Sequence, residues 1–104
     1  MTYENISPSE AKSRMDTNPE AVIVDVRRPD EFVTGHIPGA INVPLADIQD
    51  GNIPPCIADK NAVYLIYCRS GVRSVTAAVT LEKMGYTRLA NFGGILDWPY
   101  EIEH

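Results

Sequence analysis

The fold of this chain is decided by the stretch YLIYCRSGVRS, residues 64–74. An apolar run rich in β-forming residues, 62–67, delivers Cys68 to its carboxyl end, and a short polar loop with Gly71 at its centre leads into a helical pattern over Ser74–Met84. This order predicts a strand, a tight loop and a helix N-terminus in direct succession. In open α/β sheets, ligands bind outside the carboxyl ends of the strands, where a helix N-terminus presents unpaired N–H groups to an anion. A cysteine at that position is predicted to be a thiolate.

Strands and helices alternate in the predicted secondary structure of the whole chain. Apolar runs of β-forming residues predict five strands: Thr2–Ile6 at an edge, Ala21–Val26, Ile41–Val43, Ala62–Cys68 and Arg88–Phe92. Helical patterns predict four helices: Pro8–Met15 behind an N-cap at Ser7, a short one from Pro29, Ser74–Met84 before a stop at Gly85, and a last one from Ile95. The stretch 45–56 is predicted to be irregular or weakly helical, and Gly93-Gly94 to be a turn. The alternation is typical of the α/β class, with a mostly parallel central sheet flanked by helices, in one domain spanning 1–104.

Composition and charge narrow the class of protein and of partner. The chain has 104 residues, a formal net charge of −5 and a pI near 4.8. Nucleic acids and anionic membranes are bound through basic patches, so neither is an expected partner. No apolar run approaches the roughly 20 residues of a membrane span, and the start of the sequence has no basic and apolar leader. The two cysteines, Cys56 and Cys68, are too few for a disulfide framework, so we expect a soluble protein of the reducing, cytoplasmic compartment.

Cys68 is the candidate nucleophile. An unperturbed cysteine, with a pKa of about 8.5, is only a few per cent thiolate at neutral pH, whereas a helix N-terminus and adjacent arginines lower that pKa. Arg69 and Arg73 flank the loop, and Gly71 permits a tight curve in which the loop amides surround the sulfur as an anion-binding nest. The candidate substrate-binding residues are Arg69, Ser70, Gly71, Val72, Arg73 and Ser74. The two serines either donate hydrogen bonds to bound sulfur or oxygen or serve as caps, and the alternative for Cys68 itself is an inert core thiol.

Three further residues stand out beyond this loop. Asp25 lies late in a buried strand, where a carboxylate needs partners, and either Arg27 or the backbone of a neighbouring loop can supply them. We therefore predict that this pair supports the floor of the site. His36, in a turn-rich segment, is predicted to be a hydrogen-bonded turn residue, because a thiol that is already ionised needs no base.

Two blocks of sequence resemble those of a known family. The loop C-R-S-G-V-R at 68–73, together with D-V-R-R-P-D-E-F at 25–32 and G-H-I-P-G-A-I-N-V-P at 35–44, resembles the single-domain rhodaneses, which are thiosulfate and related sulfurtransferases. The match runs from about Ala21 to Trp98, and the blocks have the family's order and spacing. The resemblance implies a rhodanese-like three-layer sandwich, with a parallel sheet between helices. It also implies that Cys68 carries a persulfide between a sulfur donor and a thiophilic acceptor, held by the loop backbone.

The expected reaction is a two-step sulfur transfer. The Cys68 thiolate takes the outer sulfur of thiosulfate, a small anionic donor, and passes it to cyanide, a small thiol or a protein acceptor. No metal or organic cofactor is expected, because the cysteine performs the chemistry. Cys56 is either a plain loop thiol or a thiol that resolves the persulfide as a disulfide.

Two other functions are alternatives. A persulfide relay or binding module would form the same persulfide but exchange it with a protein docked on the loop, and a shallow fold with no second domain predicts an accessible Cys68 for either function. A cysteine-dependent phosphatase is the lesser alternative, because those enzymes place their phosphate-binding arginine six positions after the cysteine. Here Ser74 occupies that position and Arg73 lies five positions after Cys68, so the shorter loop predicts a tighter pocket, suited to one added sulfur atom.

Overall fold

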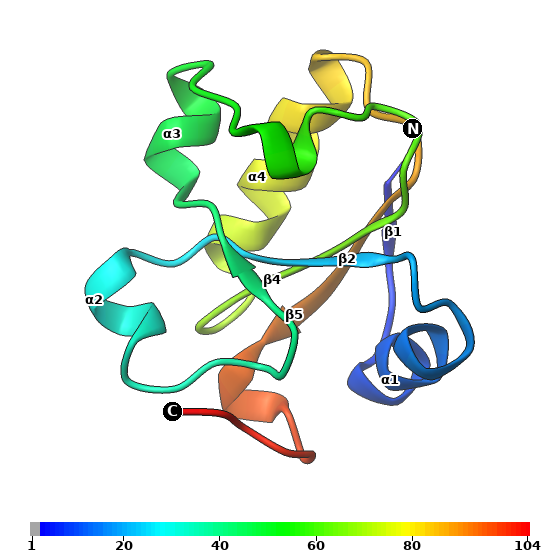
Figure 1. Cartoon of the computed structure of the whole chain (residues 1–104), viewed down its shortest axis with the longest axis vertical. Coiled ribbons are helices and arrows are strands. Elements are labelled where there is room, and N and C mark those ends of the chain that lie inside the picture. The colour runs from blue at the N-terminus through cyan, green and yellow to red at the C-terminus, as the bar shows by residue number, and fades with distance from the viewer. Residues whose placement is uncertain (1–2) are drawn as a thin grey trace.

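The central sheet contains five parallel strands, which confirms the predicted α/β class. In this computed structural model, which describes residues 3–104, the strands lie in the order β1-β5-β4-β2-β3. Their bounds are β1 Tyr3–Asn5, β2 Val22–Asp25, β3 Ile41–Asn42, β4 Tyr64–Cys68 and β5 Leu89–Gly94. β4 holds the middle position and pairs with β5 on one side and β2 on the other (Figure 1). The carboxyl ends of these three strands meet at one edge of the sheet, where Cys68 ends β4.

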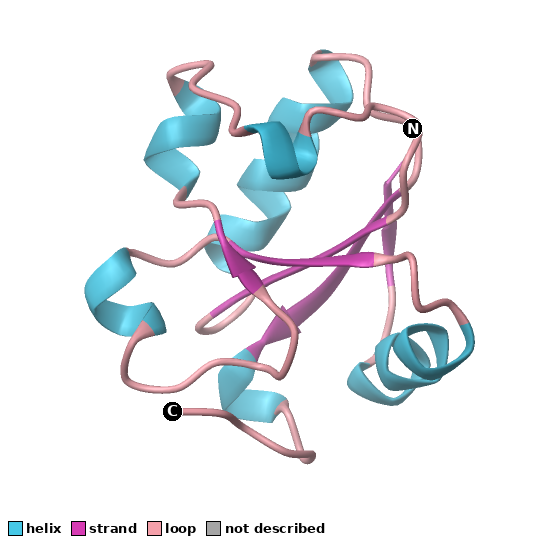
Figure 2. Cartoon of the chain, viewed as in Figure 1, coloured by secondary structure: helices cyan, strands magenta, loops and turns pink. Residues whose placement is uncertain are grey.

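Helices cover both faces of the sheet and complete the predicted three-layer sandwich (Figure 1, Figure 2). The helices are α1 Pro8–Thr17, α2 Pro29–Phe32, α3 Leu45–Gln49 and α4 Val72–Lys83, with the 3-10 turns η1 Pro55–Ile57 and η2 Ile95–Asp97. α3, α4 and η1 pack on one face of the sheet, and α1 packs on the other face beside the carboxyl-terminal segment. Within residues 3–104, none of these helices has the length and apolar character needed to cross a bilayer.

β4 lies in the core along its whole length. Each of its five residues has an exposed fraction of 1% or less. Alternate side chains point to opposite faces, so that Ile66 and Cys68 pack towards α4 while Leu65 and Tyr67 pack towards α1. Each fully buried aliphatic side chain of this kind contributes about 1.5–3 kcal/mol of burial free energy. The reactive end of the strand is therefore fixed by a rigid and doubly covered element.

Three element boundaries near the site differ from the sequence prediction. α4 begins at Val72 rather than at Ser74, because Gly71 forms the N-cap with a φ of 104°. The predicted turn at Gly93-Gly94 is wrong, because β5 continues through both glycines and pairs Gly94 with Cys68. The predicted last helix is only the single 3-10 turn η2, since Trp98 is extended, as the residue before a proline prefers to be.

The remaining elements lie close to their predicted places. Ser7 caps α1 by accepting a hydrogen bond from the Glu10 amide at 3.1 Å, and the helix continues two residues beyond the predicted end at Met15. The stretch 45–56, predicted to be irregular or weakly helical, contains α3 and the first two residues of η1. Thr2, the first residue of the predicted edge strand, lies outside the described residues.

Candidate active site

A three-residue loop joins the end of β4 to the start of α4. Cys68 is the last residue of β4, residues 69–71 form the loop, and Val72 is the first residue of α4. Gly71 adopts the left-handed conformation that favours glycine, which turns its amide back towards the strand. That amide donates a hydrogen bond to the Cys68 Sγ at 3.0 Å. The predicted succession of strand, tight loop and helix N-terminus is present, and it encloses the sulfur.

The surroundings of Cys68 stabilise its thiolate. Burial on its own would raise the pKa of Cys68, but hydrogen bonds from the Ser74 hydroxyl and from the Ser74, Gly71 and Ser70 amides outweigh it, so that the pKa lies below its usual value. The residue is only 1% exposed. The prediction of an accessible cysteine is therefore wrong, because the loop itself closes over the sulfur.

Ser74 is the loop's buried hydroxyl donor. Its side chain is fully buried, and its Oγ lies 3.2 Å from the Gly71 carbonyl oxygen and 3.4 Å from the Gly93 carbonyl oxygen. A hydroxyl has one proton to donate, so these carbonyls share it with the Cys68 sulfur. The helix cap is Gly71 and not Ser74, and donation from Ser74 to a bound sulfur or oxygen stays a prediction.

β5 supports the loop from behind through two glycines that the sequence analysis placed in a turn. A Cβ on Gly71 would lie 3.3 Å from the Gly93 Cα, and a Cβ on Gly94 would collide with the Arg69 carbonyl group. The Leu96 amide also donates a hydrogen bond to the Arg69 carbonyl oxygen at 3.2 Å. The pair of adjacent glycines was the available signal for this close approach of two backbones.

Arg73 projects from the first turn of α4 and forms an ion pair with Glu31 of α2. Its Nη1 and Nη2 lie 2.6 Å and 2.9 Å from the two carboxylate oxygens. The contact with Arg73 holds the pKa of Glu31 at about 2, well below its usual range, and Glu31 in turn raises the pKa of Arg73. The sequence analysis identified Arg73 but missed its partner Glu31, which lies 42 positions earlier in the chain.

The other predicted loop residues point outward. Arg69 and Ser70 are exposed, and Val72 is 73% exposed. The Arg69 guanidinium has no ion pair or hydrogen bond with the described residues. Residues 70, 71 and 74 therefore contribute donors to Cys68, whereas residues 69 and 72, in the loop and at the start of α4, face outward.

Asp25 and Arg27 form the predicted buried pair. The Arg27 Nη2 lies 2.8 Å from the Asp25 Oδ2 and 2.6 Å from the Gly35 carbonyl oxygen, and the two side chains are 5% and 0% exposed. Asp25 pairs in register with Tyr67, the residue before Cys68, and the Arg27 guanidinium lies 5.9 Å from the centre of the Tyr67 ring. The pair thus contacts Tyr67 on the α1 side of the sheet, and Cys68 packs on the opposite side.

Among the described residues, His36 and Cys56 form no hydrogen bond with Cys68. The His36 ring stacks on Phe32 with 4.0 Å between ring centres, and its Nδ1 lies 3.3 Å from the Phe32 carbonyl oxygen, so the predicted hydrogen bonding is present, although the backbone of His36 forms a β-bridge with Glu103 and not a turn. Cys56 is exposed on η1, near Tyr64 at the amino end of β4. Four residues of strand, about 13 Å, separate that end from Cys68, which is too far for a disulfide without rearrangement. No group of three His, Cys, Asp or Glu side chains within the described residues has the closeness of a metal site.

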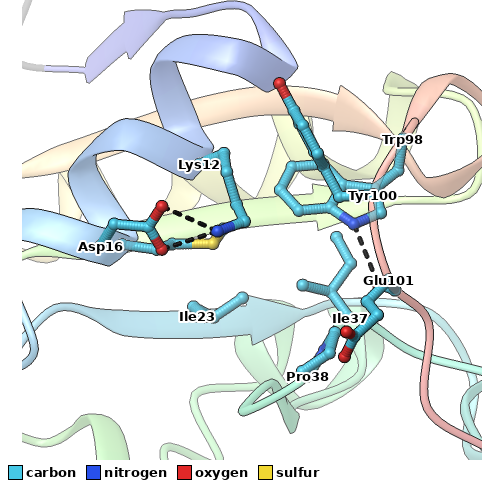
Figure 3. A pocket seen from close by; sticks show the side chains of 9 residues that line it. Lys12, Asp16, Ile23, Ile37, Pro38, Trp98, Tyr100 and Glu101 are labelled. Atoms are coloured by element: carbon cyan, nitrogen blue, oxygen red, sulfur yellow. Dashed lines mark hydrogen bonds and ion pairs between the residues drawn. The ribbon is translucent and has the colours of Figure 1, made fainter.

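A cavity of about 480 Å³ lies apart from the cysteine loop, between α1 and the carboxyl-terminal segment (Figure 3). Ile23 and Ile37 form its apolar floor, and Trp98 and Tyr100 form one wall. On its rim, Lys12 is already paired with Asp16 at 2.7 Å. The residues that line this cavity include no cysteine, and the thiol with a lowered pKa lies instead at the loop that follows β4.

Comparison with known proteins identifies one family that matches most of the chain. A family model described as the rhodanese-like domain matches residues 7–100. The thiosulfate sulfurtransferase PspE of Escherichia coli is 39% identical over 74 residues, 71% of this chain and 70% of that protein. A sulfurtransferase of Allochromatium vinosum is 39% identical over 101 residues, 94% of this chain and 89% of that protein. The crystal structure of a rhodanese-like domain protein from Staphylococcus aureus superposes with a TM-score of 0.81 at 33% identity, over 96% of each chain. With this fold, this cysteine loop and these relatives, the chain belongs to the rhodanese-like domain family of sulfurtransferases.

Proposed function

We propose that this protein carries a sulfane sulfur as a persulfide on Cys68, taking it from thiosulfate or a related donor and giving it to a thiophilic acceptor. The observation that carries the proposal is the Gly71 amide at 3.0 Å from the Cys68 Sγ, in a loop whose donors lower the pKa of that thiol. A stabilised thiolate at the end of a central strand is a nucleophile that is ionised before substrate arrives. A compartment that keeps thiols reduced, such as the cytoplasm, suits this chemistry.

The first step loads the cysteine. The Cys68 thiolate attacks the outer sulfur of thiosulfate, forming a sulfur–sulfur bond while the bond between the two thiosulfate sulfurs breaks. The electron pair of that bond leaves with sulfite, so one thiolate and one dianion become one persulfide anion and one dianion. The amides of 70, 71 and 74 then hold the single negative charge of the persulfide, as donors of this kind do for a developing anion.

The second step removes the outer sulfur from the Cys68 persulfide. The thiolate of a small thiol, or cyanide, attacks the outer sulfur of the persulfide, and the electron pair returns to the Cys68 Sγ. In this mechanism Arg69 supplies positive charge at the loop, Arg73 lies beside it with its charge offset by Glu31, and Ser70, Val72 and Ser74 shape the loop. Asp25 and Arg27 act indirectly: they fix the position of Tyr67 and therefore of the end of β4. The two half-reactions predict ping-pong kinetics.

The mass of the intact protein tests this proposal. Wild type and Cys68→Ser are incubated with thiosulfate and compared by mass spectrometry, with Cys56→Ser as the matched control. A gain of one sulfur atom in wild type and in Cys56→Ser, but not in Cys68→Ser, is the expected result. A gain that survives in Cys68→Ser, or no gain in any variant with thiosulfate or with a persulfide donor, would overturn the proposal.

A relay between proteins is the second candidate, and the exposed apolar residues beside the loop favour it. Val72 is 73% exposed and Leu96 is 62% exposed, and the Leu96 amide is hydrogen-bonded to the loop at Arg69. Apolar surface beside a nucleophile suits a docking protein better than a small anion. Turnover of thiosulfate with cyanide favours the free enzyme, whereas loading from a persulfidated protein alone favours the relay.

A further inference from the structure

The Glu31–Arg73 ion pair occupies the face of Arg73 that an anion would use. Both terminal nitrogens of the guanidinium bind one carboxylate oxygen each, at 2.6 Å and 2.9 Å. This is the paired geometry by which arginine also binds sulfonate-like and phosphate-like groups, so a donor with such a group competes with Glu31 for the same two nitrogens. The side chains of Glu31 and Arg73 are 19% and 33% exposed, so water screens the pair only in part.

The structure holds Glu31 in place independently of Arg73. Glu31 is the third residue of α2, and its Oε1 also accepts a hydrogen bond from the Arg28 amide at 3.2 Å, which closes the first turn of that helix. Its carboxyl has a pKa of about 2, so it stays ionised at any pH at which the enzyme would be assayed. The charge of Arg73 is therefore offset by a fixed anion.

We infer that Glu31 determines donor specificity by withholding Arg73 from small dianionic donors, so that the Cys68 loop is suited to a sulfane sulfur carried on a thiol. This inference rests on the proposed function and narrows its donor class. Near the loop, Arg69 is the cation that no described residue neutralises, and the Glu31–Arg73 pair contributes no net charge. A thiosulfate dianion meets less attraction there than two free arginines would provide.

A thiol-borne donor needs less of this attraction. The Cys68 thiolate attacks the outer sulfur of R–S–SH, the bond between the two donor sulfurs breaks, and the electron pair leaves on R–S⁻. The persulfide proton stays on the transferred sulfur, giving Cys68–S–SH. The leaving group carries a single negative charge, and the apolar side chain of Val72 lies at the same surface for the carrier group R to contact.

The test compares donors of different charge on one pair of matched variants. Glu31→Gln keeps the oxygen that accepts from the Arg28 amide but removes the charge that holds Arg73. Glu10→Gln is the control: Glu10 is likewise the third residue of its helix and pairs with an arginine, Arg14, at 2.9 Å. Both substitutions change the net charge by the same amount. Loading of Cys68 is followed with thiosulfate and with the persulfide of 2-mercaptoethanol, which carries at most one negative charge.

Glu31→Gln is expected to lower the KM for thiosulfate about three- to ten-fold and to leave kcat within about two-fold, since a freed guanidinium attracts a dianion in the ground state. The KM for the thiol persulfide should change less than about two-fold. The decrease in the KM for thiosulfate should be smaller in 0.5 M salt, and Glu10→Gln should have the KM values of wild type. In the double variant with Arg73→Met, the KM for thiosulfate should no longer be lowered, because Glu31 acts through Arg73.

An unchanged or raised KM for thiosulfate in a folded Glu31→Gln protein would overturn the inference. An equal decrease of the KM for both donors would also overturn it. Glu31→Ala serves the same comparison if the glutamine variant does not fold. Failure of the proposed function has a different signature, because wild-type Cys68 would then accept sulfur from neither donor.

Discussion

The α-carbon of Gly94 lies so close to the Arg69 carbonyl group that no side chain fits between them. Gly94 has an ordinary extended backbone, so the need for glycine here comes from contact and not from the backbone conformation. Gly94→Ala is expected to push the cysteine loop away from β5, lowering the free energy of unfolding by about 1–3 kcal/mol and sulfur loading by at least about ten-fold. Urea unfolding and intact mass after thiosulfate treatment measure the two effects.

Gly51→Ala is the control for that experiment. Gly51 has a φ of 77°, which is unfavourable for alanine, but no atom lies within 4 Å of the position that an alanine Cβ would occupy. Gly51→Ala therefore strains the backbone without a steric collision. We expect it to lose stability and keep normal loading. If Gly94→Ala loads sulfur at the wild-type rate, the close contact is not needed for the shape of the loop.

Ser74→Ala is expected to raise the pKa of Cys68, because the variant lacks the hydroxyl that stabilises the thiolate. Thiolate absorbance followed against pH, in a Cys56→Ser background, measures the change. Stability should fall by only about 1 kcal/mol, the usual cost of one buried hydrogen bond. Thr76→Ala, which removes an exposed hydroxyl of the same helix, should leave the titration unchanged.

Asp25→Asn is expected to destabilise the fold by about 3–5 kcal/mol, because Arg27 would keep its buried charge without a counter-ion. Chemical denaturation gives the value. The matched surface change is Asp16→Asn, which breaks the exposed pair with Lys12 and should cost less than about 1 kcal/mol. Similar losses for the two variants would mean that Arg27 is solvated, contrary to its 5% exposure.

Acid should weaken the protein through Glu31. Its pKa in the folded state is about 2, against an ordinary value of 4.5, so the stabilisation from Arg73 is complete above pH 4.5 and disappears as the pH falls towards 2. Allowing for solvent screening at this partly exposed pair, we expect the stability gap between wild type and Glu31→Gln to be about 1–2 kcal/mol at pH 6 and to close on acidification. A gap that stays constant from pH 6 to pH 2.5 would mean that the ion pair adds nothing to the folded state.

The sequence predicts the architecture well because its strands are strongly marked. The apolar run before Cys68 predicts a strand that is buried on both faces, and the alternating elements predict the parallel sheet and its helical layers. The prediction fails at Gly93-Gly94. Two glycines resemble a turn locally, and only the backbone of Arg69, 25 positions earlier, explains why they continue a strand.

The candidate site is predicted in part for a similar reason. The local pattern identifies Cys68 with the loop donors, and separately the pairing of Asp25 with Arg27, since the members of each group lie within a few residues of each other. Glu31 is missed because it joins the site through a contact across the fold. Burial of the sulfur is also missed, because it depends on how the loop folds back over its own cysteine.

The order of the strands has a consequence for synthesis on the ribosome. β1, the first strand made, pairs only with β5, the last one, through contacts such as Tyr3 with Leu89. A nascent chain that ends before β5 therefore leaves its first strand without a neighbour and its cysteine loop without Gly94 behind it. Because domains emerge amino end first, the thiolate site is completed only after β5 has been made, so the nascent chain gains its reactive centre as the sheet closes.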